Sequence, residues 1–315
     1  MSVFTQLSAA QVAAWLESYS LGTLQSLTGI SEGVQNSNFF LSTTHGDYVL
    51  TVFEQVPAAQ VPRYVQLLAH LAQHGLPCPA PVADRSRRYV SALGGKPAVI
   101  VSRLAGRSEK SPNVAQCTAI GDMLARLHRV AGSWPEALPH QRDSHWCATV
   151  ASEIAPLLDD ADGRLLRDEV AHQQAQRPGD LPRGVIHADL FRDNALFTGD
   201  RLSGVLDFYF AGVDDLLFDL AVTVNDWCAR PDGTLDDRRC AALLDAYHAQ
   251  RPLLAAEHAA WPTLLRAAAL RFWLSRLHDR HLPRAGELIT ERDPDAYRTI
   301  LRARIASGSD CPWRS

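Results

Sequence analysis

Three polar side chains stand among apolar neighbours in one short stretch of the chain, residues 185–208. They are Asp189, Asn194 and Asp207. A buried carboxylate is costly unless it is paired, hydrogen-bonded or bound to a metal, so these residues are candidates for chemistry. Thr198-Gly199-Asp200 predicts a turn between two apolar strands. The resulting hairpin would bring Asp207 alongside the loop that holds Asp189 and Asn194.

Phosphoryl transfer needs such a set of groups. One carboxylate accepts the proton of the attacking hydroxyl, while an amide and a second carboxylate hold Mg²⁺ on the phosphates. We therefore predict Asp189 as the catalytic base, and Asn194 and Asp207 as metal ligands. Each residue alone is more often a turn or cap residue, but all three at this spacing argue against a purely structural role. We expect His187 to hold the loop by hydrogen bonds from a buried position.

The spacing H-x-D-x-x-x-x-N, followed after a hairpin by Asp-Phe, resembles the catalytic loop and metal-binding aspartate of protein kinases. Ala188 stands in place of the arginine of His-Arg-Asp, and Tyr209 follows Phe208 in place of a glycine. In both departures the sequence resembles small-molecule kinases of the aminoglycoside phosphotransferase superfamily. The resemblance implies transfer of the γ-phosphoryl group of ATP to a small hydroxyl-bearing metabolite.

Glycines and polar residues in the first third of the chain predict a nucleotide site. The turn from Gly29 to Gly33 can lay backbone N–H groups over ATP phosphates, although such a turn is as often an ordinary hairpin. Adenine is expected in a hinge around residues 102–104. The predicted nucleotide-binding residues are Gly29, Ser31, Gly33, Asn36, Asn38, Thr51, Ser102 and Leu104.

A kinase normally carries a lysine on its third strand, paired to a glutamate on the next helix. Here Thr51 stands at the lysine position, and the helix predicted over residues 58–73 contains no glutamate. By their positions in the sequence, neither Lys96 nor Lys110 can substitute. Loss of both partners is physically consistent, because a lone buried glutamate would be costly. Backbone donors, Thr51 and Mg²⁺ are the candidates for holding the α- and β-phosphates.

Hydrophobic periodicity predicts the elements that position these residues. In the first third we expect a helix over residues 8–19, strands within 27–41 and over 48–53, a helix over 58–73, and strands over 89–92 and 98–103. Helices are expected from residue 114, between the proline-rich breaks near 135–139 and 178–182, and from about 218 onward. This order predicts an α+β, two-lobe protein-kinase-like fold, with an antiparallel sheet and one helix in the first lobe. We expect residues 1–103 to form a nucleotide-binding lobe and 104–315 a mainly helical catalytic and substrate-binding lobe.

Composition excludes several classes of protein. A chain of 315 residues, 46% apolar and 21% charged, has the composition of an ordinary globular protein and is longer than one core usually serves. Its net charge of −4 gives no general attraction for nucleic acid or anionic membranes. No apolar run is long enough to cross a bilayer.

The six cysteines show no C-x-x-C spacing, which argues against zinc and against a disulfide framework. A reducing cytoplasm suits them. We therefore expect a cytoplasmic enzyme with a small-molecule substrate, present as a monomer or homodimer.

Several runs together are similar to one subfamily, the kinase-like homoserine kinases of the aminoglycoside phosphotransferase fold, which are unrelated to the GHMP kinases. Thr51 at the lysine position is part of this resemblance, which covers nearly the whole chain. It implies phosphorylation of L-homoserine in threonine biosynthesis, with ATP and Mg²⁺ as cofactors. The runs span residues 29–39, 49–54, 187–194, 207–211, 218–228 and 270–277.

Charge independently favours an acceptor that carries a carboxylate. Aminoglycosides are polycations that favour acidic clefts, whereas the predicted helical tail is rich in arginine, whose fork suits a carboxylate. We predict substrate contacts from Tyr209, Trp227, Arg271 and Arg276. The two arginines are five positions apart, so we expect one to bind and the other to pack or pair, and a structural salt bridge is at least as frequent for each.

Two alternatives stay open. In the first alternative, the acceptor is another small hydroxyl compound, such as an aminoglycoside, a choline-like alcohol or methylthioribose. Otherwise the chain is a nucleotide-binding pseudokinase that regulates a partner. The missing lysine–glutamate pair favours the pseudokinase, and the intact set of Asp189, Asn194 and Asp207 opposes it.

Overall fold

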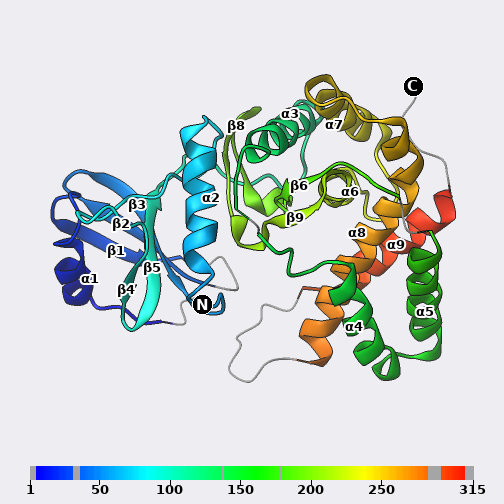
Figure 1. Cartoon of the computed structure of the whole chain (residues 1–315), viewed down its shortest axis with the longest axis horizontal. Helices are drawn as coiled ribbons and strands as arrows, with labels where there is room; N and C mark the ends of the chain where they lie inside the picture. Colours follow the sequence, from blue (N-terminus) through cyan, green and yellow to red (C-terminus); the bar gives the residue numbers. More distant parts are fainter. Residues whose placement is uncertain (1–4, 31–35, 137, 177–178, 283–291, 309–315) are drawn as a thin grey trace. The chain divides into compact units, whose positions relative to one another are not determined.

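The computed structural model describes residues 5–30, 36–136, 138–176, 179–282 and 292–308. The chain forms two compact units (Figure 1). The N-terminal unit comprises Met1–Gly106 together with Ser203–Tyr209, and the C-terminal unit comprises Arg107–Leu202 and Phe210–Ser315. Among the helices within these ranges, none has the length and apolar character needed to cross a membrane.

A five-stranded sheet forms the centre of the N-terminal unit, with the strand order β1-β2-β3-β5-β4. Each neighbouring pair is antiparallel. The described part of the unit also contains the helices α1 and α2, and the Ser8 side chain caps α1 by accepting the Gln11 N–H. The elements are α1 (Ala9–Leu16), β1 (Leu24–Gly29), β2 (Asn36–Thr43), β3 (Gly46–Phe53), α2 (Val61–Gln73), β4 (Ser91–Leu93) and β5 (Lys96–Ser102).

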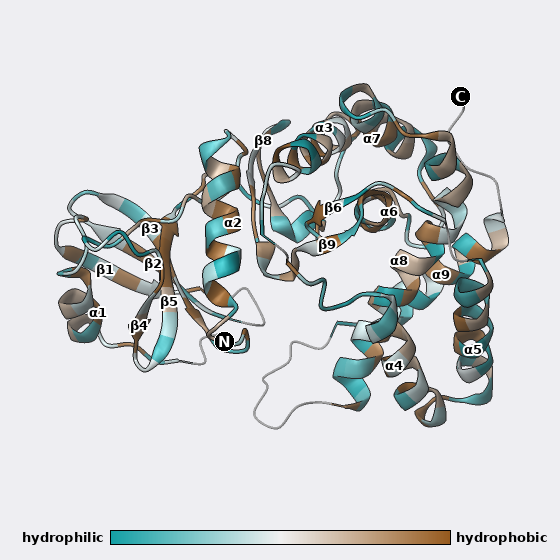
Figure 2. Ribbon diagram, in the orientation of Figure 1, coloured by the Kyte–Doolittle hydropathy of each residue, from teal (hydrophilic) through white to brown (hydrophobic). Residues whose placement is uncertain are grey.

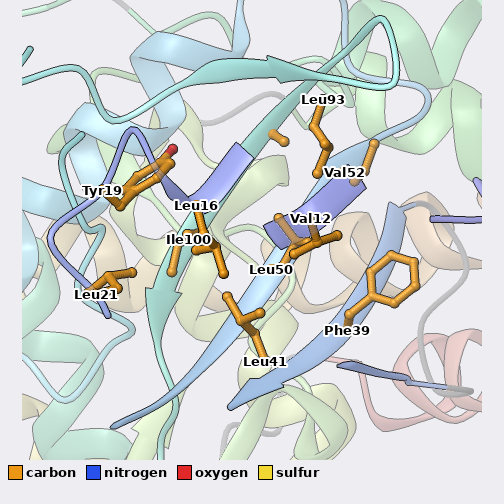
Figure 3. Close-up of a cluster of buried hydrophobic side chains, with 11 residues drawn as sticks. Val12, Leu16, Tyr19, Leu21, Phe39, Leu41, Leu50, Val52, Leu93 and Ile100 are labelled. Atoms are coloured by element: carbon orange, nitrogen blue, oxygen red, sulfur yellow. The ribbon is translucent and has the colours of Figure 1, made fainter. Parts of the chain in front are cut away.

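One face of this sheet packs against α1 and forms a hydrophobic core. In Figure 3, Val12 and Leu16 of α1 converge with Leu41, Leu50 and Ile100 of three strands. All five side chains are almost completely buried, and complete burial of each aliphatic side chain contributes about 1.5–3 kcal/mol. Because side chains alternate along a strand, the residues between these core positions point to the opposite face of the sheet.

The C-terminal unit is mainly helical and is built around α6, nearly all of whose side chains are buried. In Figure 2 α6 is largely hydrophobic, whereas α5 carries hydrophilic residues along part of its length. The helices are α3 (Val114–Ala131), α4 (Ser144–Ile154), α5 (Asp160–Ala175), α6 (Leu216–Trp227), α7 (Asp237–Gln250), α8 (Ala255–His281) and α9 (Pro294–Ser307).

Short strands and 3₁₀ turns surround the predicted catalytic segment. Strand β6 (Arg183–Ile186) pairs antiparallel with β9 (Gly212–Asp215). Strands β7 (Ala195–Thr198) and β8 (Arg201–Val205) form a second two-stranded sheet. The 3₁₀ turns η2 (Arg192–Asn194) and η3 (Phe208–Phe210) flank the β7–β8 hairpin, and a further 3₁₀ turn, η1 (Ala155–Leu157), follows α4.

The predicted α+β class, with an antiparallel N-terminal sheet and a helical C-terminal part, is confirmed. The single helical stretch expected between the two proline-rich breaks is in fact two helices, α4 and α5, because Pro156 lies in η1 between them and Asp159 caps α5. Pairing of β6 with β9 was not predicted, since strands this short have little periodicity. The assignment of nucleotide binding to residues 1–103 and of catalysis to 104–315 stays a prediction.

Gly121 lets α3 and α7 approach closely. A Cβ at this position would lie 2.1 Å from the backbone oxygen of Leu243 in α7. We expect Gly121→Ala to lower the free energy of unfolding by about 1–3 kcal/mol, because the two helices must separate. Thermal or urea unfolding measures this loss.

Gly163, inside α5, is the matched control. An added Cβ there meets only the end of the Arg167 side chain, 3.3 Å away, and a backbone oxygen at 3.6 Å. We expect Gly163→Ala to leave stability unchanged or raise it by up to about 1 kcal/mol. Equal behaviour of the two variants would contradict this account of the α3–α7 contact.

Candidate active site

The loop after β6 holds Asp189 in a constrained backbone. Ala188, immediately before it, has a φ of 64°, in the left-handed region that residues with a Cβ rarely adopt. The N–H of Asp189 donates to Nδ1 of His187 at 3.2 Å, and the His187 side chain is completely buried. The expected buried, loop-holding position of His187 is therefore confirmed.

A buried carboxylate from α6 holds this loop. Asp219 accepts the backbone N–H of His187 at 2.7 Å and that of Ala188 at 2.8 Å. It also lies 3.0 Å from Nε2 of His128, whose other ring nitrogen is 2.7 Å from the Tyr247 hydroxyl. Burial alone would raise the pKa of Asp219, but the hydrogen bond and charge of His128, with His187, bring its pKa below the ordinary value. Asp219 is thus an ionised acceptor that fixes the left-handed turn before Asp189.

Asn194 lies against Asp189 at the end of η2. Its amide nitrogen donates to the backbone oxygen of Asp189 at 2.8 Å and to the carboxylate Oδ2 at 3.1 Å. The amide nitrogen is therefore engaged, and the amide oxygen is the atom that can face a cation. Carboxylate and amide oxygens are the donors that Mg²⁺ prefers, so the Asn194 amide oxygen fits the predicted role of a metal ligand.

A second contact from α6 holds the same loop at Arg192. The backbone N–H of Arg192 donates to Asp226 at 2.8 Å, and its guanidinium Nε donates to the same carboxylate at 3.1 Å. Burial raises the pKa of Asp226, and the nearby Arg192 opposes that rise. Trp227, predicted as a substrate contact, is completely buried, and its indole N–H donates to the Leu190 oxygen at 3.0 Å. This position favours a supporting role under the loop for Trp227.

Arg271 of α8 is a buried cation for which the described residues supply aromatic rings and no ion pair. Only 3% of its surface is exposed, and it forms no ion pair or hydrogen bond with any part of the chain that the structure describes. Its guanidinium lies 3.8 Å from the Phe272 ring centre and 5.6 Å from that of Phe210. Burial lowers the pKa of Arg271, and the negative charge of Asp189 is the largest opposing influence. An unpaired buried charge is costly, so Arg271 is suited to an anionic ligand near Asp189.

Arg276 is placed differently. Its guanidinium donates to the backbone oxygen of Asp293 at 2.7 Å and lies 4.5 Å from the Tyr297 ring centre. Burial lowers the pKa of Arg276. Of the two arginines predicted to contact substrate, Arg276 is thus engaged by the protein, whereas Arg271 is not.

The predicted nucleotide-binding residues of β2 and β3 form a hydrogen-bonded group in the N-terminal unit. Thr51 donates its hydroxyl proton to Oδ1 of Asn38 at 2.7 Å. Asn36, at the start of β2, accepts the Glu54 N–H at 3.4 Å. Thr51 lies between the core residues Leu50 and Val52, so it belongs to the sheet face away from α1.

The other nucleotide-binding predictions lie at strand ends. Gly29 is the last residue of β1, and Ser102, the last residue of β5, accepts the Ala80 N–H at 2.9 Å. Leu104 follows β5 and packs so closely on Gly204 that a Cβ there would lie 2.6 Å from it. Ser31 and Gly33 lie outside the described residues.

Lys96 faces the opposite side of the sheet from Thr51. It shares its face with Ala98 and Ile100, which belong to the core under α1, and it forms an ion pair with Glu54. The Glu54 carboxylate also accepts hydrogen bonds from two hydroxyls, those of Thr5 and Ser37, each at 2.6 Å. The prediction that Lys96 does not replace the kinase lysine is consistent with this position.

Asp207 and Tyr209 belong to the N-terminal unit. Asp207 has a φ of 60°, again in the left-handed region. The ring of Tyr209, predicted as a substrate contact, packs edge-on against Phe53 of β3 and Tyr64 of α2, with ring centres 4.9 and 6.3 Å away. Burial, with the negative charge of Asp207, raises the pKa of Tyr209.

Residues 26–253 match the family described as the phosphotransferase enzyme family (APH). The chain belongs to this family, and the superfamily resemblance predicted from the catalytic loop is confirmed. It is therefore an enzyme of the phosphotransferase class.

Curated relatives match over nearly the full length. The chain is 48% identical to a homoserine kinase of Methylobacillus flagellatus over 307 residues, 98% of this chain and 96% of the relative. It is also 48% identical to a homoserine kinase of Janthinobacterium sp. over 310 residues, 97% of this chain and 96% of the relative.

Solved structures share the fold at low sequence identity. The amicoumacin kinase hAmiN matches with a TM-score of 0.70 at 14% identity, over 95% of this chain and 92% of that one. Spectinomycin phosphotransferase APH(9)-Ia matches with a TM-score of 0.71 at 9% identity, over 97% of this chain and 100% of that one. At these identities the likeness concerns the fold alone.

Sequence reasoning did not find Asp219, Asp226 and His128 as supports of the loop. Asp219 did leave a signal, because it is a lone charge in the apolar start of α6, Leu216-Leu-Phe-Asp-Leu-Ala-Val222. Buried charges of this kind are rare without partners. The partners themselves are distant in sequence and were not predictable from spacing.

We expect Asp219→Asn to destabilise the protein by about 1–3 kcal/mol at pH 7, because an amide NH₂ would face a backbone donor of the loop and leave it unsatisfied. Thermal unfolding measures the loss. Since the folded-state pKa of Asp219 is lowered, its contribution is complete above about pH 4 and is lost as pH falls through the folded-state pKa. The difference between wild type and variant should therefore shrink on acidification.

Asp168→Asn is the matched control, since Asp168 lies exposed on α5. We expect Asp168→Asn to unfold like the wild type at pH 7 and at pH 3. A constant Asp219→Asn deficit from pH 7 down to pH 3 would contradict the role assigned to the ionised carboxylate.

Proposed function

We propose that the chain transfers the γ-phosphoryl group of ATP to the side-chain hydroxyl of L-homoserine and releases O-phospho-L-homoserine and ADP. The observation that carries this proposal is the buried guanidinium of Arg271, whose Nε has no hydrogen-bond partner among the described residues and on which Asp189 exerts the largest opposing charge influence. A hydroxyl acceptor that bears a carboxylate would supply the missing anion. The near-full-length similarity to proteins named homoserine kinase supports the same acceptor.

Direct in-line transfer is the proposed mechanism. Asp189 accepts the proton of the homoserine hydroxyl, and the Asn194 amide keeps the carboxylate oriented by donating to it. The O–H bond and the bond between the γ-phosphorus and the bridging oxygen break, while the new O–P bond forms. The proton passes to Asp189 and ADP leaves with the electron pair of the broken P–O bond. A positioned base of this kind contributes at least about 10²-fold to turnover.

Mg²⁺ would be held by Asn194 and Asp207, and it supplies charge neutralisation at the β- and γ-phosphates when it is bound. For Asp207 the assignment rests on its sequence spacing after the β7–β8 hairpin, which matches the metal-binding aspartate of kinases. The nucleotide itself would be bound by the N-terminal unit. The residues proposed for it are Gly29, Ser31, Gly33, Asn36, Asn38, Thr51, Ser102 and Leu104.

Charge on the acceptor side separates homoserine from the polycationic alternatives. A buried, unpaired arginine repels an aminoglycoside and attracts a carboxylate. Arg276 and Trp227 would then act around the acceptor or behind it, with Arg271 as the direct contact. We further propose a role in threonine biosynthesis in the cytoplasm, for a monomer or a homodimer.

A substrate panel tests the proposal. With ATP and Mg²⁺ we expect ADP production with L-homoserine to exceed that with D-homoserine, threonine, choline, methylthioribose or kanamycin by at least tenfold in kcat/KM. Asp189→Ala should lower turnover by about 10²-fold or more while thermal unfolding stays close to that of the wild type. Preference for another alcohol would reassign the acceptor, and nucleotide binding without turnover across the panel would indicate a pseudokinase.

Arg271→Met tests the carboxylate contact. We expect the KM for L-homoserine to rise by about 10- to 100-fold, since a charge-assisted hydrogen bond contributes about 1.5–3 kcal/mol. The KM for ATP should change by less than about twofold, and the melting temperature of the free enzyme should stay or rise, because an unpaired buried charge is removed.

3-Aminopropan-1-ol is homoserine without its carboxylate. Assaying wild type and Arg271→Met with both acceptors gives a four-way comparison that isolates the contact with the carboxylate. We expect Arg271→Met to matter little with this analogue, because the group that Arg271 would bind is absent. Arg280→Lys, at an exposed position of the same helix, should behave as wild type with both acceptors. An equal loss by Arg271→Met with both acceptors would refute direct recognition of the carboxylate.

A further inference from the structure

The two elements that in a kinase carry the lysine–glutamate pair are joined here by an aromatic side chain. Strand β3 contributes Phe53, two residues after Thr51 and therefore on the same face, and helix α2 contributes Tyr64. The Tyr209 ring meets both edge-on, at 84° to Phe53 and 87° to Tyr64. Edge-to-face aromatic pairs at such distances are favourable beyond the area they bury. All of these residues belong to the N-terminal unit.

A polar contact accompanies the aromatic packing. The Thr51 side chain lies within interaction range of the Tyr209 hydroxyl, and it partly opposes the rise that burial causes in the Tyr209 pKa. Because Thr51 gives its own proton to Asn38 at 2.7 Å, its oxygen is the atom open to the tyrosine hydroxyl. The result is a chain of neutral groups, Tyr209–Thr51–Asn38, that reaches from the segment after β8 across β3 to β2. Groups in one hydrogen-bonded chain polarise and order one another.

Tyr209 is two residues after Asp207, whose backbone is in a strained conformation. A φ of 60° in a residue with a Cβ is held only where the surroundings enforce it. Phe208, between the two residues, is 3% exposed. A fixed Tyr209 ring therefore restricts the direction in which the Asp207 carboxylate points.

We propose that Tyr209 is a positioning residue that takes over the task of the absent lysine–glutamate pair. It ties the segment of the metal ligand Asp207 to β3 and α2 through packing on Phe53 and Tyr64 and through the hydrogen-bonded chain to Thr51 and Asn38. The neutral link needs no buried ion pair, which agrees with the lack of both a lysine and a glutamate at these positions. The inference rests on the proposed function in one respect, the role of Asp207 as a ligand of Mg²⁺. It assigns Tyr209 a positioning role in place of the predicted contact with the substrate.

Tyr209→Phe, Thr51→Val and the double variant test the proposal. We expect each single variant to weaken binding of Mg²⁺·AMP-PNP, measured by calorimetry, by about 3- to 10-fold, and to raise the Mg²⁺ concentration for half-maximal turnover by a similar factor. The KM for L-homoserine should change by less than about twofold. The double variant should be no weaker than about the worse single variant, because both changes break the same chain.

Two controls separate positioning from general damage. Thr51→Ser keeps the hydroxyl and should restore Mg²⁺·AMP-PNP binding to within about twofold of wild type. Tyr48→Phe removes a hydroxyl from the same strand, at a residue that packs against the core under α1 and so lies on the other face from Thr51, and this variant should bind the nucleotide as wild type does.

Several results would overturn the proposal. A rise in the KM for L-homoserine upon Tyr209→Phe, with nucleotide and Mg²⁺ binding unchanged, would return Tyr209 to the acceptor site. Fully additive losses in the double variant would show that Tyr209 and Thr51 act separately. Calorimetry with Mg²⁺·AMP-PNP needs no acceptor, so its result does not depend on the homoserine assignment. A wrong acceptor is therefore distinguishable from a wrong role for Tyr209, Thr51 and Asn38.

Discussion

The buried Asp219 carboxylate is the interaction on which the catalytic loop depends. A loop that exposes a base must leave regular pairing, and the backbone N–H groups of His187 and Ala188 are consequently without partners in a sheet. Asp219 accepts both of them, at 2.7 and 2.8 Å, and His128 stabilises its charge. Without that acceptor, the left-handed turn at Ala188 would combine backbone strain with unsatisfied donors in the core.

Side chains of helix α6 therefore determine the geometry of the loop. Asp219 near its start and Asp226 near its end hold the two sides of the segment that contains Asp189. The Trp227 indole adds a third contact to the Leu190 oxygen. Because α6 is nearly all buried, these groups belong to a well-packed element, which would keep the direction of the proposed base Asp189 constant.

The distribution of charge distinguishes this chain within a widely shared fold. In the N-terminal unit, neutral and aromatic groups stand where a kinase carries its lysine–glutamate pair. They are Thr51, Phe53, Tyr64 and Tyr209. In the C-terminal unit, Arg271 is buried and its Nε has no hydrogen-bond partner among the described residues. The solved structures with the same fold include enzymes named for spectinomycin and amicoumacin. Enzymes named for different acceptors thus share one scaffold, so the fold alone does not decide the acceptor.

The sequence by itself determined what depends on neighbours along the chain. Catalytic-loop spacing, the turn at Thr198-Gly199-Asp200, the Ser8 cap and the missing lysine are all local patterns of residue type, and so is the alternation that marks the strands of the sheet. Local patterns predict local conformation, because turns, caps and strand periodicity arise from interactions a few residues apart.

Only the tertiary structure decided which polar groups meet. Arg271 and Arg276 look alike in the sequence, yet one is unpartnered and the other donates to the Asp293 backbone. Asp219 holds a loop 31 residues away, and Tyr209 packs against a strand and a helix from the first third of the chain. These outcomes follow from packing between distant segments, where a partner is selected by shape and burial, and no spacing along the chain encodes that choice.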